Sequence, residues 1–132
     1  MYQKEIKKNN ENIIFEYIYN QKQGFSIAEI CQILDLSFPT VKRIFQSFLE
    51  KEILMESKKI GNGVGRKAME YIYNENFCYS IGVQIVEEGL QFAFINSVGK
   101  ILLSKKDDII YNEEKILPNL LKSLLDFLEE IL

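Results

Sequence analysis

Residues 26–50 read SIAEICQILDLSFPTVKRIFQSFLE and predict two short helices joined by a turn. Ser26 precedes Glu29 by three residues, which is the spacing of a capping box, so the first helix is expected over residues 27–34. Pro39 falls in the first turn of the second helix, where a missing N–H costs nothing. Two helices joined by so short a turn are typical of a helix-turn-helix.

The second helix, with Ser37 as its N-cap and its end at about Lys51, is predicted to have two different faces. Its apolar stripe consists of Val41, Ile44, Phe45, Phe48 and Leu49. The opposite side carries Pro39, Arg43, Gln46 and Glu50, flanked by Lys42 and Ser47. We expect one face to pack and the other to be free to bind. Helix spacing alone leaves a plain helical bundle with a solvated charged face as the alternative.

A β-hairpin is predicted next, because the strand-like runs 53–58 and 67–73 flank the glycine-rich segment KIGNGVGR, residues 59–66. A phosphate-binding glycine loop would need a helix after it, whereas here a strand follows a strand. A hairpin directly after a helix-turn-helix is the wing of a winged helix. The densest basic cluster of the chain lies there, and its members are Lys58, Lys59, Arg66 and Lys67. Helix and wing together favour DNA binding over a solvated charged loop.

The composition is typical of a soluble globular chain, with 132 residues, 47% of them hydrophobic, and a net charge of −3. This charge is unevenly distributed, at +2 over residues 1–70 and −5 over residues 71–132. Only the first half of the chain therefore has a charge that favours binding to a polyanion. Apolar side chains at helical spacing also predict a first helix from Asn9 to about Gln21.

Several classes of enzyme and metal site are poorly supported. The chain has no histidine, which removes Ser-His-Asp and Cys-His nucleophiles. Cys31 and Cys78 lack the spacing of a zinc site or a disulfide framework, so we expect no metal, no cofactor and a reducing cytoplasm. Cys31 lies on an apolar stripe and is expected to be buried. The sequence predicts neither a transmembrane helix nor a secretory signal.

The polar segment 74–76 separates a first predicted domain, residues 1–74, from a second one, residues 75–132. In the second domain, alternating apolar residues and turn signals predict three antiparallel strands, over about 77–85, 90–96 and 100–106. The final segment, 113–132, is predicted to be a helix whose apolar share is too wide for one exposed face. These apolar residues need further protein to cover them, which predicts a domain interrupted partway. A helical dimer interface is the alternative explanation.

With these residues identified, the chain resembles the N-terminal part of the ROK family (repressors, open reading frames and sugar kinases), specifically its transcriptional regulators. The resemblance is carried by NII (12–14), GFSIAEI (24–30), LSFPTVKR (36–43), LEKEIL (49–54) and GNGVGRK (61–67), of which the last two are the most specific. It implies an α+β fold with a winged helix-turn-helix, followed by the start of an actin-like domain of the ROK sugar-kinase type.

Kinase members of that family carry an Asp-x-Gly-x-Thr phosphate motif at the first strand of this domain, where this chain has Gln84-Ile85-Val86-Glu87-Glu88. Without the carboxylate for Mg²⁺ and the glycine that admits a phosphate, the domain is expected to be a sensor and not a kinase. The sugar-contacting residues, the structural zinc motif and most of the dimer interface of the family lie beyond residue 132. We therefore expect either a truncated chain or a naturally short regulator.

The resemblance and the residues together predict a sequence-specific DNA-binding regulator, a repressor of a sugar-utilisation operon, that binds double-stranded operator DNA as a homodimer. A sugar effector is expected only with a longer C-terminal domain, and no membrane partner is expected. The predicted DNA-contacting residues are Ser37, Pro39, Thr40, Lys42, Arg43, Gln46, Ser47, Lys59, Arg66 and Lys67. The alternative is a winged-helix protein-interaction module, whose binding would depend far less on salt.

Overall fold

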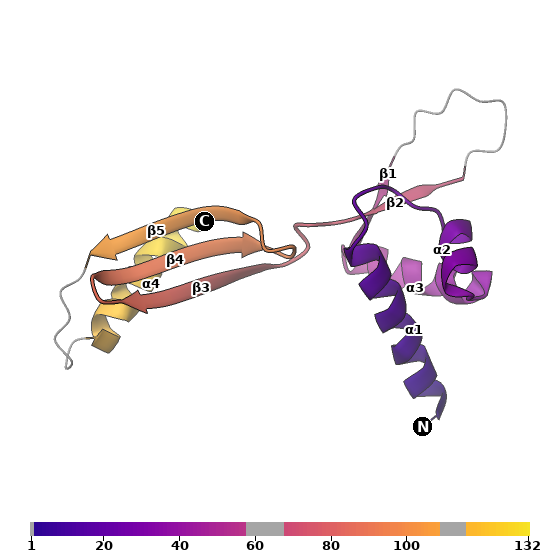
Figure 1. Cartoon of the computed structure of the whole chain (residues 1–132), viewed down its shortest axis with the longest axis horizontal. Helices are drawn as coiled ribbons and strands as arrows, with labels where there is room; N and C mark the ends of the chain where they lie inside the picture. The colour runs from indigo at the N-terminus through magenta and orange to yellow at the C-terminus, as the bar shows by residue number, and fades with distance from the viewer. Residues whose placement is uncertain (1, 58–67, 109–115) are drawn as a thin grey trace. The chain divides into compact units, whose positions relative to one another are not determined.

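The computed structural model describes residues 2–57, 68–108 and 116–132 of the chain (Figure 1). The chain divides into two compact units, Met1–Phe77 and Cys78–Leu132. The first combines helices with a two-stranded sheet, and the second combines a three-stranded sheet with one described helix, so the fold is a mixture of α and β. No helix of the described segments has the length and apolar character needed to cross a membrane.

The first unit contains three helices followed by a pair of antiparallel strands. Their bounds are α1 Tyr2–Tyr19, α2 Ile27–Leu34, α3 Phe38–Glu50, β1 Leu54–Ser57 and β2 Glu70–Tyr73. α2 lies over the predicted residues and has the predicted capping box, in which the Ser26 N–H donates to Glu29 Oε2 over 2.6 Å. α1 begins seven residues earlier than predicted, because residues 2–8 lack glycine and proline and are helix-forming without being apolar.

Apolar side chains from all three helices form the core of the first unit. The fully buried ones include Ile14, Ile18, Ile30, Val41, Ile44 and Phe45. The Phe45 ring makes edge-to-face contacts with Phe25 and Tyr71, with centroids 5.9 and 5.1 Å away. Such contacts stabilise a pair of rings beyond the area that they bury. They tie the middle of α3 to the strand β2. Cys31, predicted to be buried, is only half-buried.

An isolated antiparallel β-bridge, which the sequence pattern did not predict, links Phe25 to Tyr71 of β2 in the first unit. The Phe25 N–H donates to the Tyr71 carbonyl over 2.9 Å, and the Tyr71 N–H donates back over 2.8 Å. Burial, and then the charge of Glu56, raise the pKa of the Tyr71 phenol above its ordinary value. Phe25 thus connects the turn before α2 to the hairpin after α3.

The second unit is a three-stranded antiparallel sheet with one helix on one face (Figure 1). Its elements are β3 Tyr79–Val86, β4 Gly89–Asn96, β5 Ile101–Asp108 and α4 Ile116–Ile131. α4 packs on β4 and β5, and its Phe127 ring stacks on Phe92 with centroids 5.3 Å apart. These two rings and Leu90 form the small buried core.

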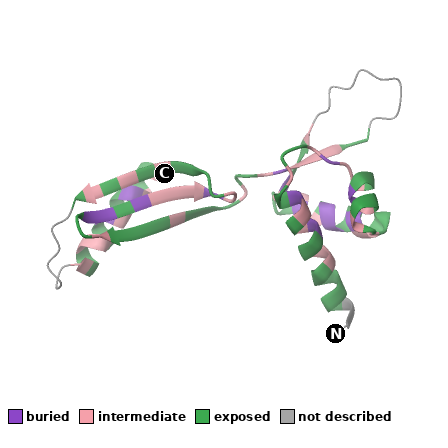
Figure 2. Ribbon diagram, in the orientation of Figure 1, coloured by how far each residue is buried: buried purple, intermediate pink, exposed green. Residues whose placement is uncertain are grey.

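Burial is uneven across this sheet, as Figure 2 shows for β4 and β3. β4 carries the buried residues Leu90 and Phe92, whereas most of β3 is exposed. The alternation of apolar residues predicted for β3 is present in the strand register, since Ile81 pairs with Phe94 and packs against the core. Val83 and Ile85 on the same side stay exposed, because α4 lies over the other two strands.

Candidate nucleic-acid interface

The outer face of α3 carries most of the residues predicted to contact DNA. Lys42, Arg43 and Gln46 are exposed, and the neighbouring Ser47 is half-buried. The opposite face is buried through Val41, Ile44, Phe45 and Phe48. Since residues three and four apart share a side of a helix, the polar side chains lie together, away from the core. A rigid helix therefore presents two cations and an amide to the solvent.

The two cations on α3 are not neutralised by neighbouring carboxylates. Within the part of the chain that the structure describes, neither Lys42 nor Arg43 takes part in an ion pair. Glu50 is also exposed but lies at the C-terminal end of the helix, two turns from Arg43. The positive charge is therefore concentrated toward the N-terminal half of α3, where the helix dipole also favours anions.

Hydroxyl groups lie at the start of α3. Ser37 occupies the N-cap position, as predicted, but its side chain does not cap a backbone N–H. Its Oγ lies 2.8 Å from Thr40 Oγ1, and the two form a hydroxyl pair at the first turn. Pro39 is exposed in that turn and leaves no unsatisfied N–H of its own. This turn, with its uncapped amides, has the chemistry that binds a phosphate oxygen.

The turn between α2 and α3 determines the orientation of α3 relative to α2. Asp35 ends α2 in the left-handed conformation, at φ 52°, and the Leu36 N–H donates to the Cys31 carbonyl over 3.1 Å. α3 then begins two residues later and packs against α2. Because the turn is so short and internally bonded, the direction of α3 follows from that of α2.

One residue at this surface was missed by the sequence reasoning. Phe38, the first residue of α3, is 53% exposed and lies one turn before Lys42. An exposed aromatic ring beside a basic helix face is suited to apolar contact with a thymine methyl group. The sequence contains the information needed to identify Phe38, because residues four apart share a side of a helix and Lys42 is predicted to lie on the outer side.

The predicted wing residues Lys59, Arg66 and Lys67 lie outside the described residues. The strands on either side are described: β1 pairs with β2 from Leu54–Tyr73 to Ser57–Glu70. Among the predicted contacts, the described ones are therefore all on α3 or at its N-cap.

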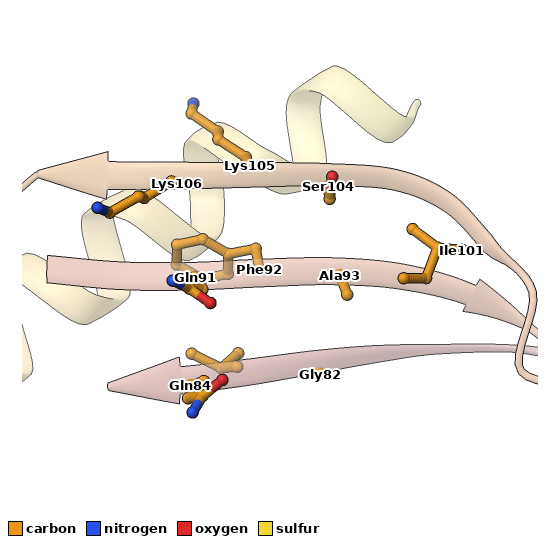
Figure 3. A pocket seen from close by; sticks show the side chains of 10 residues that line it. Gly82, Gln84, Gln91, Phe92, Ala93, Ile101, Ser104, Lys105 and Lys106 are labelled. Atoms are coloured by element: carbon orange, nitrogen blue, oxygen red, sulfur yellow. The ribbon is translucent and has the colours of Figure 1, made fainter. Parts of the chain in front are cut away.

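The second unit has a shallow hollow of about 480 Å³ on the sheet face away from α4 (Figure 3). Gln84, Gln91 and Lys106 lie side by side across it. Lys106 Nζ lies 3.0 Å from Glu88 and 3.6 Å from Asp108, so two carboxylates neutralise it. Its hydrogen bond to Glu88 raises the pKa of this lysine above the ordinary value. The described lining therefore offers no free positive charge for a phosphate group.

No family model and no curated protein matches the sequence. Among solved structures, the chain is similar to a crystal structure of a ROK family transcriptional regulator, homolog of the E. coli MLC protein. The TM-score is 0.70 at 19% sequence identity, and the match covers 95% of this chain and 32% of that one. This chain thus spans about a third of the length of that regulator. Its fold is that of part of a ROK family transcriptional regulator, as the resemblance in the sequence implied.

Proposed function

We propose that this chain belongs to a transcription regulator of the ROK type and that its first unit is a winged helix-turn-helix that binds double-stranded DNA. The observation that carries the proposal is the two-faced α3, with four buried apolar residues on one side and, on the other, Lys42 and Arg43, which form no ion pair with any described residue. A helix of this kind fits the major groove, which is wide enough to admit it. The shared fold with a regulator supports the same reading.

In this proposal the exposed residues of α3 divide into two groups. Arg43 and Gln46 read base edges, because arginine pairs with guanine and glutamine with adenine through paired hydrogen bonds. Phosphates are held by Ser37, Thr40, Lys42 and Ser47, while Pro39 shapes the first turn and Phe38 touches a thymine methyl. The wing residues Lys59, Arg66 and Lys67 contact the minor groove beside the major-groove site.

The regulator acts as a repressor of a sugar-utilisation operon in the cytoplasm and binds its operator as a twofold homodimer. A twofold dimer presents two copies of α3 to a pseudo-palindromic site, with half-sites about one DNA turn or a multiple apart. The second unit is a non-catalytic relative of a sugar kinase, with Gln84 where the kinases have an aspartate, and it uses no cofactor. A sugar effector requires a longer C-terminal domain.

Selection of duplexes from a random library, followed by fluorescence anisotropy titrations of the full chain, tests DNA binding. We expect one enriched motif and an affinity that falls steeply between 50 and 200 mM salt, by roughly 0.9 logarithmic units per phosphate contact and per logarithmic unit of salt. The absence of any enriched motif, with a partner protein bound equally at both salt concentrations, would favour the protein-interaction module instead.

A pair of matched variants distinguishes sequence readout by α3 from a general effect of positive charge on DNA binding. Lys42→Ala with Arg43→Ala removes two exposed cations from α3, and Lys7→Ala with Lys8→Ala removes two exposed cations from α1. Both double variants lose the same net charge. We expect the α3 variant to lose the motif preference and the α1 variant to retain it, whereas equal losses would contradict readout by α3.

A further inference from the structure

The first unit ends in a short segment, residues 74–77, that is hydrogen-bonded to the chain just after α3. The Asn74 side-chain amide donates to the Glu52 carbonyl over 2.7 Å, and the Asn74 N–H donates to the Ile53 carbonyl over 2.9 Å. Glu52 and Ile53 directly follow Lys51, the C-cap of α3. Asn74 thus attaches the last residues of the unit to the C-terminal end of its predicted recognition helix.

The other two polar groups of Asn74 hold the segment itself. Its side-chain oxygen accepts from the Asn76 N–H over 3.0 Å, and its carbonyl accepts from the Phe77 N–H over 3.2 Å. The first of these bonds is an Asx turn, in which an asparagine side chain takes the place of a backbone acceptor. Asn74 therefore connects the end of α3 to Asn76 and Phe77 through four hydrogen bonds.

A series of aromatic rings makes a second connection between the segment and α3. The Phe77 ring contacts Tyr73 edge to face, with centroids 5.9 Å apart. Tyr73 is buried and contacts Phe15 of α1, and the Phe15 ring contacts Phe48 of α3, with centroids 6.2 and 6.3 Å apart. A close-packed interior transmits strain, because it has little free volume in which to absorb a displacement.

The second unit begins at Cys78, directly after this segment. A displacement of the second unit is therefore applied to the first unit at Phe77, where the chain passes from one unit to the other. A flexible linker would absorb that displacement. A segment that is hydrogen-bonded to the end of α3 and packed on its core instead passes it to the helix, since hydrogen-bond networks and packed side chains carry energetic coupling.

We propose that residues 74–77 couple the second unit to α3, with Asn74 as the residue that positions the C-terminal end of the helix. The inference rests on the proposed function, since it names the route by which a change in the second unit alters DNA binding by α3. Coupling between two sites is reciprocal. A change made at Phe77 must therefore alter α3, and DNA bound to α3 must alter residues 74–77.

The first direction is measured without DNA, by hydrogen exchange of the full chain followed residue by residue with NMR. The Glu52 and Ile53 N–H groups donate to the Leu49 and Phe48 carbonyls, so their exchange reports local opening at the end of α3. We expect Phe77→Ala, which removes one ring from the aromatic series, to accelerate the exchange of both amides at least about threefold.

Two controls distinguish this coupling from a general loss of stability. The Leu36 N–H donates to the Cys31 carbonyl at the end of α2, and we expect it to exchange at the wild-type rate in Phe77→Ala. Asn20→Asp removes a matched bond, in which the Asn20 side-chain amide donates to the Glu16 carbonyl over 2.8 Å in α1. We expect it to leave the amides at the end of α3 unchanged. Equal acceleration at Leu36, or none at the end of α3, would overturn the proposal.

The second direction uses a duplex enriched in the library selection, at saturating concentration. In the wild-type chain, we expect the bound duplex to slow the exchange of the Asn76 and Phe77 amides. Asn74→Asp keeps the side-chain oxygen that accepts from Asn76 but loses the donor to Glu52, so we expect this variant to bind the duplex with less than about half of that slowing.

Two results with the duplex would contradict the coupling. One is a bound duplex that slows neither amide in the wild-type chain, and the other is an equal slowing in Asn74→Asp. A chain that binds no duplex contradicts the proposed DNA binding instead. The exchange measured without DNA then still decides whether Phe77 and the end of α3 are coupled.

Discussion

Arg43 is the single residue on which the proposed base readout depends most. Its side chain is exposed on the outer face of α3, and no carboxylate of the described chain pairs with it. We expect Arg43→Ala to weaken binding to the selected motif by about 1–3 kcal/mol and to relax the preference at one base pair. Repeating the library selection with the variant measures both effects. An unchanged motif would show that another residue reads that position.

The backbone conformation of Glu52 is strained. It follows α3 in the left-handed conformation, at φ 59°, where its N–H donates to the Leu49 carbonyl over 3.0 Å. The Ile53 N–H donates to the Phe48 carbonyl over 2.9 Å, which completes a Schellman motif. Glycine is the usual residue there, because a side chain in this conformation costs about 1–2 kcal/mol.

Replacing Glu52 by glycine is therefore expected to stabilise the first unit, by about 0.5–1 kcal/mol after the greater chain entropy of glycine is subtracted. The midpoint of urea unfolding measures the change. Glu50→Gly is the control, because position 50 is still helical and glycine there costs up to about 1 kcal/mol. The two substitutions should shift the midpoint in opposite directions, and a shift in the same direction would refute the assignment of strain to Glu52.

At the scale of elements, α3 and the hairpin β1–β2 are joined at two points, one at the middle of the helix and one just after its C-terminal end. Phe45 packs on Tyr71 of β2, and the Asn74 side-chain amide donates to the Glu52 carbonyl over 2.7 Å. The strands that lead into and out of the predicted wing are thus anchored to the predicted recognition helix. A contact made by the wing is expected to act together with those made by α3, in the adjacent groove.

The prediction for the wing concerns Arg66. Narrow A·T-rich minor grooves concentrate negative potential, which favours an inserted arginine. We expect Arg66→Ala to weaken binding more on duplexes with A·T-rich flanks than on duplexes with G·C-rich flanks around the same central motif. A competition titration with the two duplexes measures the ratio. Equal losses on both would assign Arg66 to the phosphate backbone or to the solvent.

At the scale of the whole molecule, the second unit shares a fold with a regulator whose family also includes kinases, so its chemistry needs a direct test. In the proposed non-catalytic role, Gln84 offers an amide where the resemblance places the carboxylate of a kinase, and Lys106 is neutralised by Glu88 and Asp108. We expect no hexose-dependent ADP release above that of heat-denatured protein, and no heat of binding for hexoses in calorimetry. ATP turnover with any hexose would contradict the non-catalytic role.

Much of the local structure was predictable because its signals lie within a few residues of each other. The capping box of Ser26 and Glu29 placed α2, and the apolar spacing of α3 predicted five core residues, of which the structure buries four and leaves Leu49 half-buried. The start of α1 was missed, because residues 2–8 form a helix without an apolar stripe and periodicity does not detect such a segment. The residues of the candidate site on α3 were predictable for the same reason, since the spacing that identifies the buried face of the helix also identifies its outer face.

The sequence by itself determined which segments are helices and strands and which side of α3 is polar, since periodicity, caps and turns act over a few neighbouring residues. Only the tertiary structure decided that Phe25 forms a β-bridge with Tyr71 of β2, and that Val83 and Ile85 stay exposed although they alternate like core residues. Burial depends on which distant element covers a face. Here α4, encoded some thirty residues after β3, covers β4 and β5 and leaves β3 open.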